Sequence, residues 1–352
     1  MVLAGGGFRF GYYLGMHAAA IDAGREPDLL LATCGGAVAG TIIAGLPDTG
    51  SRKAWLRSRP MYEFLGDMRS SARATPARTL FDVARRRLGG GRAVRLPDMF
   101  NDYLFELPTA LPLPQPGGAD GPALAIIGGK LLFGPHEAGR LRGGRAIYSV
   151  TLFCDGRTAA LADGLPSAIG ADGWTDAVTP DLRVDTAMPV ADAARISIAD
   201  MVYFRCQAAR GADYTGGVID LFPVELARGL ARHVTMEMKE AYDELLATPA
   251  LRSVFGLDGN RRLRHVHAQP VDVWVDTSDV RRALRGRGVR KKVDWLRNRV
   301  RLVAPSSYER YVADVDALWQ YGYERAREAY TLAAQGRRPP MRNSSRLNEA
   351  AR

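Results

Sequence analysis

The sequence predicts an α/β fold built around a largely parallel central sheet, and three observations lead to that prediction. The chain opens with two successive strand–turn–helix units, over residues 1–24 and 28–45. Its 352 residues are 47% hydrophobic, which is enough for a substantial core. Later apolar runs, over residues 123–127, 130–133 and 146–153, have strand character. Strands that alternate with helices are typical of parallel β-α-β units.

The first unit is a short apolar strand, Met1–Ala4, followed by Gly5-Gly6-Gly7-Phe8-Arg9 and a helix that ends near Gly24. Consecutive glycine N–H groups before a helix suit an anion, either a phosphate or the oxyanion of acyl transfer. A dinucleotide-binding G-x-G-x-x-G pattern would need a glycine at Phe10, and no Gly-Lys-Ser/Thr of a phosphate loop follows. The strand is short, so the native chain either starts upstream of Met1 or completes this strand in another way.

The second unit places Cys34 between an apolar strand, Leu29–Ala32, and a helix of small residues, Ala37–Ala44. One residue on a sharp turn between strand and helix, followed by Gly35-Gly36, is the arrangement of a nucleophile elbow. A helix N-terminus lowers the pKa of a thiol, so we expect a thiolate population at neutral pH. The alternative is a buried and inert cysteine, because free cysteines are among the most buried residues.

Residues 1–305 are predicted to form one α/β domain, and part of it is an insertion that lies over the sheet. The insertion, about 51–122, could act as a lid and ends in a Pro/Gly-rich linker, 108–122. A C-terminal helix is expected over 306–335 and a disordered tail over 336–352. Further elements are predicted as helices and strands: helices at 192–199 and 222–234, strands at 201–204 and within 264–276.

A third motif, Thr215-Gly216-Gly217-Val218, precedes a helix that begins at Pro223. Together with the glycine loop, the elbow and an Arg195-x-Ser197 block, it resembles the ordered motifs of patatin-like proteins. That family has Gly-Gly-Gly-x-Arg, then Gly-x-Ser-x-Gly, then Asp-Gly-Gly or Asp-Gly-Ala. The resemblance covers roughly residues 1–235.

The resemblance implies a three-layer α/β/α patatin-like fold with a lid-like insertion, and lipid acyl hydrolysis. It also implies an anion-stabilising surround formed by Gly5, Gly6, Gly7, Arg9 and Gly35. The two catalytic positions depart from the family. Cys34 replaces the serine nucleophile, and Thr215 replaces the aspartate of the Ser–Asp dyad.

Two explanations of these departures stay open. In the first, the chain is an acyl hydrolase or acyltransferase that forms an acyl-enzyme on Cys34 from a lipid-like or thioester-linked acyl group. A thiolate depends less on a general base than an alcohol does. Because position 215 is threonine and not aspartate, transfer of the acyl group to an amine, thiol or alcohol would be faster than hydrolysis. In the second, the chain is catalytically inactive and binds acyl chains or a protein partner. Asp213 could still serve as the base, whereas Asp220 is expected to be structural.

Histidines and the other cysteines add little to this site. His136 or His233 could pair with Cys34, and His17 is expected on a helix surface or in a satisfied contact. His265 and His267 would share one face of a strand but lack a third metal ligand, so we expect no metal and no cofactor. Cys154 and Cys206 end apolar runs and are expected in the core.

The formal net charge of +10 is concentrated between Arg281 and Arg301, where ten arginines and lysines face only Asp294. The spacing of Val289, Val293, Leu296 and Val300 predicts a basic amphipathic helix. Such a helix lies on an anionic membrane or on an acidic partner, or it is an ordinary surface helix that docks on the domain by its valines. Aromatic residues are too sparse there for a nucleic-acid site.

No apolar run reaches the length of about 18 residues of a membrane span. Cys34, Cys154 and Cys206 are too few and too scattered for a disulfide scaffold, so we expect a cytoplasmic protein. Peripheral membrane attachment through the basic segment is the alternative to a freely soluble protein.

Overall fold

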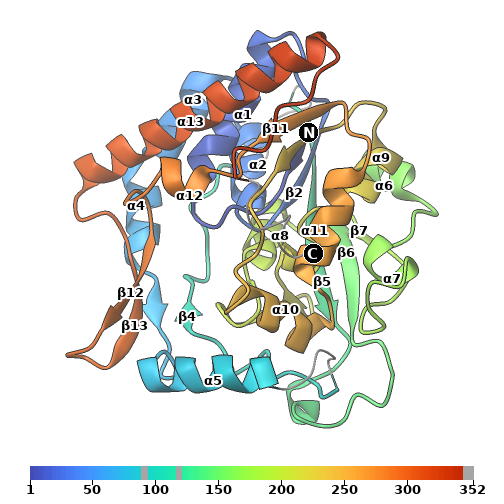
Figure 1. The fold of residues 1–352 in the computed structure, drawn as a ribbon, viewed down its shortest axis with the longest axis vertical. Helices are drawn as coiled ribbons and strands as arrows, with labels where there is room; N and C mark the ends of the chain where they lie inside the picture. Colours follow the sequence, from blue (N-terminus) through green and yellow to red (C-terminus); the bar gives the residue numbers. More distant parts are fainter. Residues whose placement is uncertain (89–93, 116–120, 344–352) are drawn as a thin grey trace.

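A computed structural model describes residues 1–88, 94–115 and 121–343. It shows a mixed α/β protein in which helices flank a central sheet (Figure 1). The α/β prediction is confirmed, but the sheet is mixed, not largely parallel. Its opening strands are parallel because helices connect or cover them, whereas β5 and β6 are joined by a loop and pair antiparallel.

The sheet has the strand order β1-β2-β5-β6-β7, and β9 and β8 attach beside β5. β1, β2 and β5 run parallel, β6 runs antiparallel to β5, and β7 runs parallel to β6. The strands span the following residues: β1 Val2–Leu3, β2 Leu29–Thr33, β5 Ala123–Leu131, β6 Tyr148–Phe153, β7 Arg183–Asp185, β8 Gln207–Ala209 and β9 Ala212–Thr215. Cys34 therefore follows the end of a central, buried strand.

Alternate residues of the central strands enter two separate cores. Leu3 and Ala32, which pair in register, pack into one core. Leu31 and Ile127 pack into the other core, on the opposite face. Because successive side chains of a strand point to opposite faces, this alternation fixes the register of β2 beneath the elbow.

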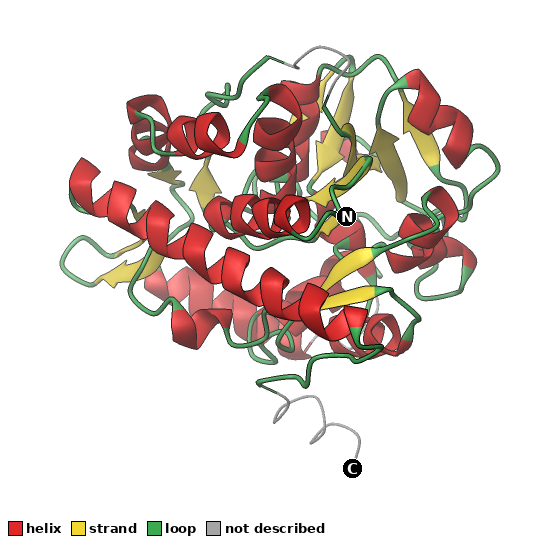
Figure 2. Cartoon of the chain, turned by 90° about the horizontal axis from the view of Figure 1, so that it is seen from above, coloured by secondary structure: helices red, strands yellow, loops and turns green. Residues whose placement is uncertain are grey.

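Helices α1 (Phe10–Asp22) and α13 (Tyr308–Ala334) pack together closely on one side of the molecule, and α13 is its longest helix (Figure 2). Glycines allow this approach. A Cβ at Gly15 would lie 2.0 Å from the carbonyl oxygen of Trp319, and one at Gly322 would lie 1.9 Å from that of Tyr12. The helix after the elbow, α2 (Gly35–Gly45), packs between α1 and α8 (Val190–Ser197).

The segment predicted as an insertion lies between α2 and β5, and helices are its main regular elements. Its elements are α3 Thr49–Leu56, α4 Arg59–Gly66, β3 Arg69–Ser70, α5 Pro76–Leu88 and β4 Phe105–Glu106. Residues 89–93 and 116–120, the latter within the predicted Pro/Gly-rich linker, lie outside the described residues. The other short elements are η1 Pro135–Glu137, α6 Gly156–Ala162, α7 Ala168–Ala171, η2 Gly217–Asp220, α9 Val224–Leu230, β10 Thr235–Met238, α10 Ala247–Phe255, α11 Gly259–Ala268, β11 Val273–Asp276 and α12 Val280–Ala283.

The helix predicted across the basic segment is wrong. The structure forms a hairpin there, β12 (Arg290–Asp294) and β13 (Arg299–Val303). Val293 and Val300 lie directly opposite each other in this hairpin. Their spacing along the chain fits one face of a helix as well as a cross-strand pair, so it does not distinguish the two structures. The turn is completed by Asn298, whose φ of 48° lies in the left-handed region that asparagine tolerates.

Two other predictions need correction. Residues 201–204 form turns with one bridge in place of a strand, since Val202 has φ 70° and interrupts extended backbone. In the predicted strand region 264–276, α11 extends to Ala268 and only β11 is a strand. Asp258 caps α11 by accepting the N–H of Arg261, which favours the helix.

The C-terminal part of the chain returns to the body of the protein. Within the tail predicted to be disordered over 336–352, residues 336–343 are described, and the backbone N–H of Arg342 donates to Asp276 (2.8 Å). Residues 344–352 lie outside the described residues. Among the helices of the described ranges, none is long and apolar enough to cross a membrane.

The contact between α1 and α13 yields a stability prediction. Gly322→Ala places a Cβ against the backbone of Tyr12, which no side-chain rotation can relieve, so the free energy of unfolding should fall by about 1–3 kcal/mol. Urea unfolding measures it. Gly66→Ala, where the added Cβ meets nothing within 4 Å, is the control and should unfold like the wild type. Equal stability of the Gly322→Ala variant would contradict the close helix contact.

Candidate functional site

Cys34 occupies a strained turn between β2 and α2. Its φ of 49° and ψ of −125° lie outside the regions that non-glycine residues ordinarily adopt. The neighbouring glycines make the turn sterically feasible. A Cβ at Gly35 would lie 2.0 Å from the carbonyl oxygen of Gly7, and one at Gly36 would lie 1.8 Å from that of Leu3. The structure therefore places Cys34 in a nucleophile-elbow geometry.

The Arg195-x-Ser197 block supports this turn from α8. The backbone N–H of Cys34 donates to Ser197 Oγ (2.8 Å), and Ser197 Oγ donates to the carbonyl oxygen of Ile127 (2.7 Å). Ser197 thus joins the elbow to the central strand β5. Arg195 Nε donates to the carbonyl oxygen of Pro108 (2.9 Å), which fixes part of the insertion to the same helix.

The thiol of Cys34 contacts a carboxylate that the sequence analysis did not identify. Cys34 Sγ donates to Asp200 Oδ2 at 2.9 Å. Burial raises the pKa of Asp200 to about 7, although the thiol and the backbone N–H of Val218 oppose that rise by hydrogen bonding. Asp200 can therefore accept a proton near neutral pH, which is the property required of a general base.

The expectation of a thiolate at rest is wrong. Burial raises the pKa of Cys34, and the adjacent negative charge of Asp200 and the hydrogen bond to it raise it further. The backbone N–H groups of Gly35 and Gly7 lower the pKa, but burial dominates. Cys34 is 6% exposed, so the resting thiol is protonated and its proton is directed at Asp200.

Thr215 and Asp213 do not reach the sulfur by any contact in the described structure. Thr215 is fully buried and its hydroxyl donates to the carbonyl oxygen of Ala199 at 3.5 Å. Asp213 lies in β9, paired with Ala208. One signal could have located Asp200, because it directly follows the helix predicted over 192–199, which contains the Arg195-x-Ser197 block. The sequence does not show that the end of this helix lies beside the end of β9, where the N–H of Gly216 donates to Ala199 O (2.8 Å).

The glycine loop lies against the elbow. The N–H of Gly5 donates to Thr33 Oγ1 (3.0 Å), immediately before Cys34. Gly7 has φ 61°, and its N–H and that of Gly35 face the Cys34 sulfur. Gly6 packs on Tyr12, and Arg9, half-buried, immediately precedes α1. The loop and the start of α2 therefore bring fixed N–H donors to the reacting atom, as an oxyanion hole requires.

A lysine whose side chain is 13% exposed holds this loop from behind. Lys239 Nζ donates to the carbonyl oxygen of Gly5 (2.6 Å) and to the hydroxyl of Tyr12 (2.8 Å), and it pairs with Glu237 (3.3 Å). Burial lowers the pKa of Lys239, and the charge of Glu237 opposes that change. By binding the carbonyl side of the Gly5 peptide, Lys239 fixes the orientation of the loop whose N–H groups face Cys34.

A cavity of about 220 Å³ opens at Cys34 and Asp200. Part of its wall comes from the insertion, through α5, and part from α10 and the hairpin residue Lys291. Apolar side chains predominate in the lining: Val83, Leu104, Met201, Val202, Val218, Leu221, Leu246, Ala247, Ala250 and Leu251. Such a cavity with a few convergent polar groups suits a largely apolar substrate.

The histidines lie away from the sulfur in the described contacts. His17, expected on a helix surface or in a satisfied contact, is 1% exposed and contacts Arg52 (3.3 Å), and burial lowers its pKa to about 3. His233 pairs with Asp272, and His136 lies in η1. His265 contacts Glu225 from helix α11, not from a strand.

Three further residues take structural positions. Asp220 is buried beside Arg262 (3.6 Å), Cys206 is buried and Cys154 is half-buried. No group of three or more His, Cys, Asp or Glu side chains within the described ranges is placed to hold a metal ion.

Comparisons with known proteins do not assign this site. No model of a protein family matches the chain, and no curated protein sequence matches it either. The chemistry of the site therefore has to follow from its own residues.

Alkylation of Cys34 tests the contact with Asp200. Because the charge of Asp200 raises the thiol pKa, Asp200→Asn should shift the pH dependence of iodoacetamide alkylation to lower pH. Peptide mass mapping across pH 6–10 follows Cys34 apart from Cys154 and Cys206. Asp213→Asn is the matched control and should leave the profile in place. An unshifted profile in Asp200→Asn would show that the carboxylate does not face the sulfur.

The Lys239–Glu237 pair yields a second test. Lys239→Met leaves Glu237 buried without its cation, so the free energy of unfolding should fall by about 3–5 kcal/mol in urea. Lys239→Met combined with Glu237→Gln should recover part of that loss. Lys53→Met removes a more exposed pair with Asp316 and should cost no more than about 1 kcal/mol. Equal effects at both lysines would argue against a buried ion pair behind the loop.

Proposed function

We propose that this protein is a thiol acyl hydrolase or acyltransferase that uses Cys34 as nucleophile and Asp200 as general base. The observation that carries the proposal is the 2.9 Å contact between Cys34 Sγ and Asp200 Oδ2 at a strained strand–helix turn. A buried structural cysteine needs neither a carboxylate partner nor an adjacent cavity. Cys34 has both.

The first half-reaction forms a thioester. Asp200 takes the proton from Sγ as the sulfur attacks the acyl carbonyl carbon, and the oxyanion forms near the N–H groups of Gly7 and Gly35. The bond between the carbonyl carbon and the leaving oxygen or sulfur then breaks. The leaving group takes the proton from Asp200, which restores the carboxylate.

The second half-reaction releases the acyl group. Water, an alcohol, an amine or a thiol loses a proton to Asp200 and attacks the thioester carbon, and the Cys34 sulfur leaves and regains that proton. The loss of aspartate at position 215 therefore does not remove the base from the site. Asp200 supplies it from the neighbouring segment, so hydrolysis is as accessible as transfer to another acceptor.

The substrate class follows from the cavity and from the motifs. An apolar wall next to the nucleophile favours a lipid-like or thioester-linked acyl group. The glycine loop, the elbow and the Ser197 support keep the order of the patatin-like motifs, which favours a patatin-like α/β/α fold with α5 and its neighbours as a lid-like insertion. Thr215 contributes by bonding the Ala199 carbonyl beside Asp200 and takes no part in proton transfer.

Intact-mass spectrometry tests the proposal directly. Incubation with acyl thioesters or acyl esters should give one acyl adduct, and incubation with a fluorophosphonate should give one phosphonyl adduct, each absent from Cys34→Ala. Asp200→Asn should slow acylation by about 10²–10⁴-fold, since it removes the general base. An adduct that decays in buffer indicates a hydrolase, and one that persists until an acceptor is added indicates a transferase.

Two results control this experiment. Asp213→Asn should acylate like the wild type. If no donor gives an adduct while iodoacetamide still labels Cys34, or if turnover is unchanged in Cys34→Ala, the catalytic proposal fails. A non-catalytic protein that binds acyl chains or a protein partner would then remain.

A further inference from the structure

We infer that the basic hairpin β12–β13 is a membrane-docking device whose partner is an anionic lipid bilayer. Its tip carries Trp295, 74% exposed, and Leu296, 101% exposed. Neither side chain contributes to the core. Large apolar side chains fully in water at the end of a projecting hairpin point to a surface that covers them.

The positive charges around the tip favour an anionic surface. Arg290, Lys292, Arg297, Arg299 and Arg301 are exposed on the two strands and the turn. Only Asp294 opposes them within the hairpin, at 3.8 Å from Arg301. Lysines and arginines near an anionic leaflet contribute about 1 kcal/mol each. Tryptophan is enriched where an apolar layer meets polar head groups.

The hairpin is held firmly enough to present its tip. Residues of β13 bond to the segment before α5: the Val300 N–H donates to Ala74 O (2.7 Å), and Ser70 Oγ donates to Val300 O (2.8 Å). These bonds hold β13 at Val300, close to the turn, and the turn beyond it projects from the molecule (Figure 1). A second copy of the chain is a poor partner, because two such tips would repel each other.

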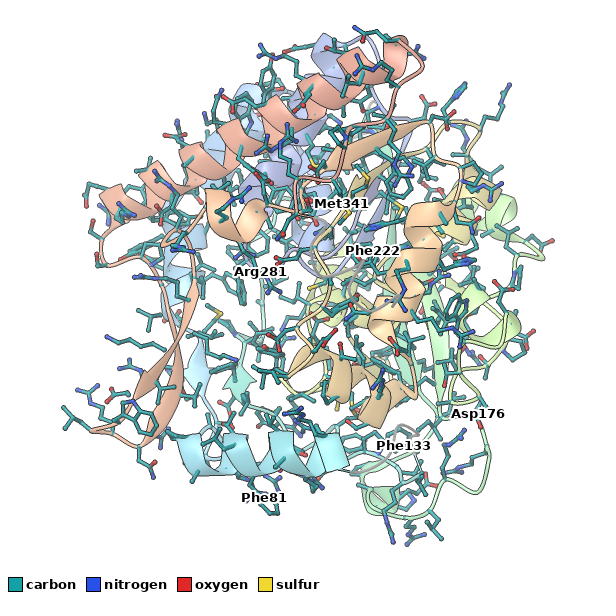
Figure 3. All side chains as sticks on the ribbon, in the orientation of Figure 1. Phe81, Phe133, Asp176, Phe222, Arg281 and Met341 are labelled. Atoms are coloured by element: carbon teal, nitrogen blue, oxygen red, sulfur yellow. The ribbon has the colours of Figure 1, made fainter. Side chains whose placement is uncertain are left out.

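Helix α5 extends the same docking surface. Leu80 and Phe81 are each 67% exposed, and Phe81 projects away from the body of the protein below α5 (Figure 3). Figure 1 places α5 and the hairpin tip toward the same end of the molecule. Both elements also border the Cys34 cavity, through Thr79, Val83 and Lys291.

Docking through the hairpin tip and α5 would therefore bring the mouth of the cavity to the lipid. This last consequence rests on the proposed function, but membrane binding itself does not. Binding is consequently measured on the Cys34→Ala protein, so that a failure of docking and a failure of catalysis are distinguishable.

The experiment is flotation with vesicles of phosphatidylcholine alone or mixed with phosphatidylglycerol. Cys34→Ala protein should bind the anionic vesicles at least about tenfold more strongly than the neutral ones, and added salt should weaken binding. Adding Trp295→Ser and Leu296→Ser should lower the partition coefficient by about tenfold or more. Introducing Lys292→Glu and Arg297→Glu into the Cys34→Ala protein, in place of the two serine changes, should lower the partition coefficient similarly.

The matched control places the same changes elsewhere. Leu161→Ser and Arg157→Glu, on α6, alter an exposed leucine, 52% exposed, and an exposed arginine on a different element and should leave binding unchanged. Melting temperatures establish that the hairpin variants are folded. Vesicles with brominated phosphatidylglycerol provide a second measurement, because the bromine quenches the fluorescence of a tryptophan that enters the lipid. This quenching should fall sharply when Trp295→Phe is introduced.

Several results would overturn the inference. They are no binding to anionic vesicles, equal binding by the hairpin and α6 variants, or quenching that is unchanged in Trp295→Phe. Self-association in solution that disappears with Trp295→Ser and Leu296→Ser would instead identify a second copy as the partner. Salt-sensitive binding to nucleic acid without binding to vesicles would also refute a bilayer partner.

Discussion

The left-handed backbone at Cys34 is the constraint on which the site depends. A non-glycine residue at φ 49° is costly, so the surrounding structure has to hold it there. Ser197 does this by accepting the Cys34 N–H and bonding the central strand, and Gly35 allows Gly7 to approach the turn. The same arrangement that stabilises the turn directs the thiol at Asp200 and sets the glycine N–H groups beside the sulfur.

The arrangement of Thr215 and Asp200 shows how a carboxylate from one segment can reach a site beside another segment. Thr215 and Asp200 belong to different segments, but the bond from Gly216 N–H to Ala199 O brings these segments together. A Cβ at Gly216 would lie 2.4 Å from Asp200 Oδ1, so the glycine of the motif leaves room for the carboxylate. Position 215 can then hold a neutral residue, while a carboxylate from the adjacent segment reaches the nucleophile.

Local patterns predicted the strand–turn–helix units, the elbow and the glycine loop, because each is encoded in a few consecutive residues. Asp200 and Lys239 were missed because their roles depend on contacts between distant segments, which spacing along one chain does not report. The basic hairpin was missed for a different reason. Val289, Val293, Leu296 and Val300 fit a helical stripe. In the structure Val293 and Val300 pair across two strands and Leu296 lies in the turn, where the conformation of Asn298 favours the hairpin.

The packing of α1 against α13 has a consequence for how the protein is made on the ribosome. Glycines on both helices let their backbones touch, so α1 reaches its native surroundings only when α13 is present. Translation delivers α1 early and α13 after almost all of the rest of the described chain. The glycine loop that precedes α1 would therefore stay without its final support through most of synthesis. Native packing of α1, and with it the final placement of the segment that leads into this helix, is in this way tied to the late release of α13.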